Sequence, residues 1–130
     1  LPSSARWHFS ARWGDIDGNG SPDLYVTDGF GVGNLLFQND TASNRFVHID
    51  VIGKGAAEGG TNRSAFGAEV RLFNAADELV GYRYVDDVAG VYFGVEEGAI
   101  YDVEVSFPGS SSVVTLSGLE GGDAPMVVEP

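Results

Sequence analysis

Oxygen-bearing side chains recur at alternate positions in one short stretch of the chain, GDIDGNGSPD, residues 14–23. The stretch follows the pattern D-x-[DN]-x-[DN]-G, in which Gly20 at the sixth position permits a sharp turn. Hard oxygen ligands in a flexible loop suit Ca²⁺ better than Mg²⁺, which requires stricter octahedral geometry. We therefore predict a calcium site, with oxygens at roughly 2.3–2.6 Å from the ion. The predicted ligands are Asp15, Asp17, Asn19, the Ser21 carbonyl and Asp23.

This loop differs from the helix–loop–helix calcium sites that share its pattern. Position 12 is Val26, where those sites place a bidentate Glu, and the flanking sequences favour strands over helices. The alternative interpretation is an Asx-rich turn that binds no metal.

Other candidate residues give weaker signals. His8 and His48 are the two histidines and lie far apart in the sequence, and His48 alternates with apolar neighbours, so we expect it on the outward side of a strand. Asp86 and Asp87 are adjacent and would face opposite sides of a strand, which argues against a joint acid–base role. In a loop they could form a second, weak cation site. No catalytic constellation emerges, and the sequence predicts a protein that is not an enzyme.

Four aromatic residues favour packing over ligand binding, although an exposed aromatic pair on a β-sandwich would permit stacking against sugar rings. They are Trp7, Trp13, Phe30 and Phe37.

The sequence predicts that short strands position these residues. Tyr101, Val103, Val105 and Phe107 alternate with polar residues, and this period of two marks a half-buried strand. The sequence therefore predicts an all-β fold with two packed antiparallel sheets. A single helical turn is allowed at 119–124. The expected buried residues include Val70, Leu72, Phe93, Val103 and Val105. The expected strands are 9–13, 23–28, 34–39, 45–53, 66–74, 79–85, 90–95, 101–109, 112–118 and 126–129.

The composition limits the class of protein and the kinds of binding partner. The chain of 130 residues has 19 acidic and 7 basic residues and a net charge of −12, which disfavours nucleic-acid binding. It contains no cysteine, which excludes disulfides, thiolate metal sites and cysteine nucleophiles. No apolar stretch is long enough to cross a bilayer. The chain begins with Leu1, and we expect a mature form or a piece of a longer protein.

The loop and the strands that follow it, GDIDGNGSPDLYV and NLLFQN, resemble the FG-GAP or VCBS repeat. In integrin α-subunits and secreted bacterial proteins such repeats form propeller blades with calcium in the loop. The resemblance covers roughly residues 9–40, and one repeat is present where a propeller needs several.

The later sequence resembles the ASPIC/UnbV domain, through NRSAFGAEVRLF, VYFGVEEGAIYDVEVSFPG and VVTLSGL. We therefore expect a calcium-loop segment at 1–42 and an antiparallel β-sandwich-like domain at 43–130. The resemblance implies a secreted or cell-surface protein that serves adhesion or protein–protein interaction through a protein or glycan ligand. Two alternatives are an accessory domain of a secreted or biosynthetic enzyme and a carbohydrate-binding module.

Overall fold

The structure is a computed structural model, and it describes residues 8–29 and 33–130. Trp7 and Phe30 therefore lie outside the described residues. The described chain is almost entirely strand and turn, with two short 3₁₀ helices, η1 (Ser43–Arg45) and η2 (Ala56–Glu58), and the predicted all-β class is confirmed. The chain divides into two compact units, Leu1–Ala42 and Ser43–Pro130, called here the N-terminal and C-terminal units.

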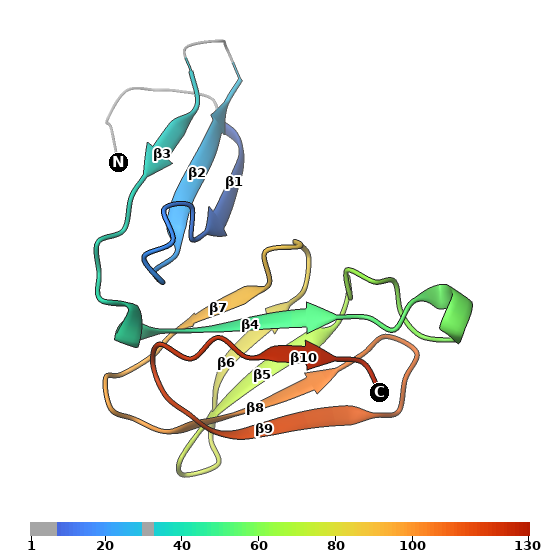
Figure 1. The fold of residues 1–130 in the computed structure, drawn as a ribbon. Helices are drawn as coiled ribbons and strands as arrows, with labels where there is room; N and C mark the ends of the chain where they lie inside the picture. The colour runs from blue at the N-terminus through green and yellow to red at the C-terminus, as the bar shows by residue number, and fades with distance from the viewer. Residues whose placement is uncertain (1–7, 30–32) are drawn as a thin grey trace. The chain divides into compact units, whose positions relative to one another are not determined.

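The N-terminal unit is a small antiparallel sheet in the order β1-β2-β3 (Figure 1). Its strands are β1 (His8–Gly14), β2 (Asp23–Asp28) and β3 (Leu35–Phe37). Gly14 pairs with Asp23, so the acidic loop is the connection of the β1–β2 hairpin. Trp13 on β1 is 56% exposed, so it is not a core residue; packing at the edge of the sheet stays a prediction.

The C-terminal unit is a β-sandwich of two sheets, in the orders β10-β4-β7 and β6-β5-β8-β9. Figure 1 shows the first sheet lying over the second. The strands are β4 (Phe46–Ile52), β5 (Glu69–Asn74), β6 (Leu79–Tyr84), β7 (Val91–Gly94), β8 (Tyr101–Ser106), β9 (Val113–Leu119) and β10 (Met126–Val128).

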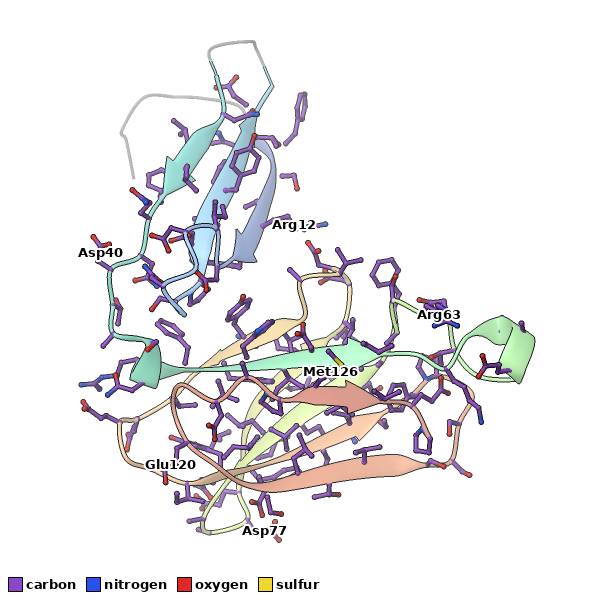
Figure 2. The ribbon with its side chains drawn as sticks, viewed as in Figure 1. Arg12, Asp40, Arg63, Asp77, Glu120 and Met126 are labelled. Carbon is purple, nitrogen blue, oxygen red and sulfur yellow. The ribbon has the colours of Figure 1, made fainter. Side chains whose placement is uncertain are left out.

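One hydrophobic core fills the space between these two sheets, as the stick view in Figure 2 shows. Strand β8 alternates buried and half-buried positions along its whole length, which is the predicted period of two. The five residues expected in the core are all buried. They are Val70, Leu72, Phe93, Val103 and Val105.

Two details differ from the sequence prediction. Strand β10 pairs with β4 in parallel, because the chain leaves β9 in one sheet and enters the other, and such a crossing does not impose a hairpin. Residues 120–123 form a hydrogen-bonded turn instead of a helical turn, with the Asp123 N–H donating to the Glu120 carbonyl. Within the described residues, no helix has the length and apolar character needed to cross a membrane.

Candidate metal centre

The acidic loop occupies residues 15–22 and is shaped by hydrogen bonds from its own backbone. The Gly20 N–H donates to Asp15 Oδ2 at 2.9 Å, and the Asn19 N–H donates to Asp17 Oδ1 at 3.1 Å. Gly18 and Gly20 have φ values of 76° and 86°, a left-handed conformation that glycine adopts without strain. The turn predicted at Gly20 is therefore present, and it points successive N–H groups at the carboxylates.

Asp23 is the fixed point of the loop. The side chain is fully buried, its Oδ2 accepts from the Ile16 N–H at 2.9 Å, and its Oδ1 accepts from the Asn39 N–H at 2.8 Å. The Asn39 and Ile16 N–H groups hold the pKa of Asp23 below its ordinary value, although burial acts in the opposite direction. Asp23 is thus a buried carboxylate that remains ionised and ties the loop to the segment after β3.

Three carboxylates converge at this point. One oxygen each from Asp15, Asp17 and Asp23 lies within 4.8 Å of the other two. Two oxygens on opposite sides of a Ca²⁺ ion, each about 2.4 Å from it, are about 4.8 Å apart, so the group could surround one cation. Among the residues that the structure describes, this is the one such group of three or more acidic or histidine side chains.

Asn19 and Ser21, the other two predicted ligands, lie in the same loop and make hydrogen bonds within it. Asn19 Oδ1 accepts from the Ser21 N–H at 2.8 Å, and Asn19 Nδ2 lies 3.3 Å from Asp17 Oδ2. Ser21 is buried, and its hydroxyl donates to the Thr41 carbonyl. The roles of Asn19 and of the Ser21 carbonyl as metal ligands stay predictions.

The segment after β3 supports the loop, a role that the calcium-loop motif does not indicate. Asn39 donates through its side chain to the Pro22 carbonyl at 3.0 Å and accepts from Asn19 Nδ2 on its own carbonyl at 3.2 Å. Gln38 Nε2 lies 3.4 Å from Asp17 Oδ2. The role of this segment follows from strand pairing. Phe37 on β3 pairs with Leu24 on β2, so the residues after β3 lie beside Asp23.

The weaker candidates do not form comparable sites. Asp86 and Asp87 lie in the connection between β6 and β7, and neither belongs to a group of three potential ligands within the described chain. His48 is on the outward side of β4, as expected, but it is half-buried: its ring stacks on Tyr92 with centroids 4.2 Å apart, and Nε2 lies 2.7 Å from the Ala89 carbonyl oxygen.

Comparison of the chain with protein-family models, with curated proteins and with solved structures finds no match.

Proposed function

We propose that the N-terminal unit binds one Ca²⁺ ion and that the chain is a non-enzymatic, secreted or cell-surface β-protein. In this proposal it serves adhesion or protein–protein interaction, as its resemblance to an FG-GAP or VCBS repeat followed by an ASPIC/UnbV domain implies. The convergence of Asp15, Asp17 and Asp23 within 4.8 Å is the observation that carries the proposal.

The chemistry of the ligands favours calcium. All three converging side chains are carboxylates, and the chain has no cysteine to offer a thiolate. Soft and borderline metals prefer sulfur and imidazole, whereas carboxylate and carbonyl oxygens suit hard cations. The ligand oxygens of an irregular loop need not form a regular octahedron. Ca²⁺ accepts such variable geometry, whereas Mg²⁺ requires near-ideal octahedral coordination.

The arrangement of Asp23 favours a structural role for the ion. Both oxygens of this carboxylate already accept backbone N–H groups from two separate segments. An ion bound beside it would neutralise the repulsion among the three carboxylates and stabilise the hairpin connection. Catalysis would instead require an open coordination position and a group poised to transfer a proton.

The expected affinity agrees with an extracellular location. The loop lacks the bidentate Glu that tightens the calcium sites of intracellular sensors, and extracellular modules bind in the range of about 10⁻⁴–10⁻³ M. We therefore expect binding at extracellular calcium concentrations and little occupancy at cytosolic ones.

Calorimetric titration with CaCl₂ and with MgCl₂ tests the proposal. We expect one Ca²⁺ per chain, weaker Mg²⁺ binding, and at least about tenfold weaker Ca²⁺ binding in Asp17→Ala. Asp40→Asn is the matched control, because Asp40 is an exposed acid of the same unit outside the converging group (Figure 2). Equal Ca²⁺ affinity in wild type and Asp17→Ala would refute the site.

A further inference from the structure

Strand β9 is the outer strand of the β6-β5-β8-β9 sheet (Figure 1), and within the described residues it pairs with β8 alone. In that part of the chain, the backbone groups on its other side form a free sheet edge. Such an edge can pair with a strand of another chain. Proteins usually prevent this pairing by keeping an edge strand short or by placing charges, proline or a bulge on it.

Strand β9 lacks most of these protections. It is seven residues long and contains no proline, and the sequence has no charged residue from Val105 to Leu119. The other outer strands of the C-terminal unit are better protected, because β7 and β10 have only four and three residues and β6 contains Arg83. A bulge at residues 117–118, where β9 has one residue more than β8, leaves Val113 to Leu116 as the regular part of the edge.

The hydrophobic core is open along this edge. Val114 and Leu116 pack against the core but are only half-buried, whereas their partners on β8, Val105 and Val103, are fully buried. Apolar surface on the inner side of β9 therefore stays in contact with water. A further strand beside β9 would cover it, and burial of that surface would favour the association.

The distribution of charge identifies a second copy of this chain as the partner. A chain of net charge −12 repels its own copies wherever acidic surfaces meet. Glu104 and Asp102 lie one strand away from the edge, on β8. If two β9 strands pair, the two β8 strands are three strand spacings apart, about 14 Å, which exceeds the Debye length of about 8 Å at physiological ionic strength. Two copies can therefore meet at this uncharged edge with little repulsion.

We propose that two copies of this chain form a dimer by antiparallel pairing of β9 about a two-fold axis at Thr115. In such a pair, residues that face each other lie on the same side of the sheet, so an inward residue must face an inward one. An axis at Thr115 meets this condition. Thr115 faces the partner's Thr115 on the outward side, and Val114 faces the partner's Leu116 on the inward side, where each covers the open core.

Sedimentation velocity of the full chain, at concentrations from micromolar to millimolar, tests the proposal. We expect a reversible monomer–dimer equilibrium that is the same with calcium and with chelator, because β9 belongs to the C-terminal unit. Added salt should strengthen the dimer, because it screens the repulsion between two copies of net charge −12.

Thr115→Lys should weaken dimerisation by at least about tenfold, although it lowers the net negative charge, because two ammonium groups would meet at the axis. Val80→Lys is the matched control, because it adds the same charge at an exposed position of the opposite outer strand, β6. It should not weaken dimerisation.

A single introduced cysteine measures the register, since the chain has no cysteine of its own. Thr115→Cys should form a disulfide-linked dimer in air, because facing Cα atoms of antiparallel strands are about 4.5–5.5 Å apart, which a disulfide can span. Val113→Cys is the control on the same strand. Its two copies would lie about 14 Å apart along the strands and should not link.

A chain that stays monomeric at every concentration would overturn the proposal and leave this edge to a strand of a different protein. Dimerisation that is undiminished in folded Thr115→Lys would overturn it as well. So would equal cross-linking of Thr115→Cys and Val113→Cys, because that result would indicate random collision or a different register.

Discussion

Two loops of this molecule are each organised around a buried carboxylate, one in each unit. In the N-terminal unit, Asp23 accepts the N–H groups of Ile16 and Asn39. In the C-terminal unit, Glu129 Oε2 accepts three hydrogen bonds from the connection between β4 and β5. The donors are the Lys54 N–H at 2.8 Å, the Thr61 N–H at 2.8 Å and the Thr61 hydroxyl at 2.7 Å.

The two carboxylates differ in the charges around them. The Lys54 N–H holds the pKa of Glu129 below its ordinary value against the effect of burial, with help from the Thr61 hydroxyl and N–H and a smaller attraction from the Lys54 ammonium. Asp23 has Asp15 and Asp17 as neighbours. Both carboxylates accept backbone N–H groups, but Glu129 has a cationic neighbour and Asp23 has two anionic ones. Hydrogen-bond satisfaction and charge balance are thus separate requirements, and the imbalance at Asp23 is what supports a cation there.

Glycine also acts differently in the two loops. A Cβ at Gly60 would lie 2.7 Å from Glu129 Oε2, so this glycine is required for close approach of the backbone to the carboxylate. A Cβ at Gly18 would meet nothing within 4 Å, and that glycine is required for its positive φ. The Glu129 loop is closely packed at Gly60, whereas Gly18 of the acidic loop faces open space.

The largest effect expected from this comparison is at Glu129. Glu129→Ala leaves the Lys54 and Thr61 N–H groups without their acceptor, and we expect the melting temperature of the C-terminal unit to fall by roughly 10 °C. Near-ultraviolet circular dichroism measures this unit, because it contains four of the five tyrosines, Tyr82, Tyr84, Tyr92 and Tyr101.

Lys54→Met is the control for that experiment. The Lys54 backbone N–H makes the hydrogen bond and survives the substitution, while the exposed ammonium supplies a smaller, solvent-screened attraction. A loss as large as that of Glu129→Ala would show that charge pairing, and not hydrogen bonding, holds the loop.

The next effect concerns the unbalanced charge of the acidic loop. Calcium should raise the stability of the N-terminal unit by RT ln(1 + [L]/Kd), about 1.4 kcal/mol at a tenfold excess over Kd. Both tryptophans, Trp7 and Trp13, belong to this unit, so tryptophan fluorescence follows its thermal unfolding. Asp17→Ala should lose most of the calcium-dependent increment but little stability in chelator, because it also relieves repulsion.

Equal calcium-induced shifts in wild type and Asp17→Ala would identify the loop as an acidic turn without a metal. If calcium raised the melting temperature measured by the tyrosine signal but not the one measured by tryptophan fluorescence, the ion would lie in the C-terminal unit. That result would contradict the difference drawn here between the two loops.

The smallest effect expected is on the melting temperature at acidic pH. The folded-state pKa of Glu129 is lowered from 4.5, so its contribution is complete above that pH and disappears as the pH falls through the folded value. Between pH 6 and pH 3, wild type should lose a few degrees more in melting temperature than Glu129→Gln, which has no carboxylate to protonate. Parallel losses in the two proteins would show that other carboxylates control acid unfolding of this unit.

The sequence by itself determined the strand positions and the local form of the acidic loop. All ten expected strands are present, because alternation and turn residues act over a few neighbouring positions. The turn at Gly20 likewise follows from residues within the loop. The convergence of Asp15 and Asp17 with Asp23 needed one further short-range event, closure of the β1–β2 hairpin.

Tertiary structure decided the partners that lie far apart in the chain. Glu129 and Lys54 are 75 positions apart, and the parallel pairing of β10 with β4 places them together. Asn39 reaches Asp23 through the register of β3 on β2. The free edge of β9 depends on the order of the four strands in its sheet. Alternation tells which side of a strand a residue occupies but not which strand lies beside it, because the choice of neighbour depends on burying one common core.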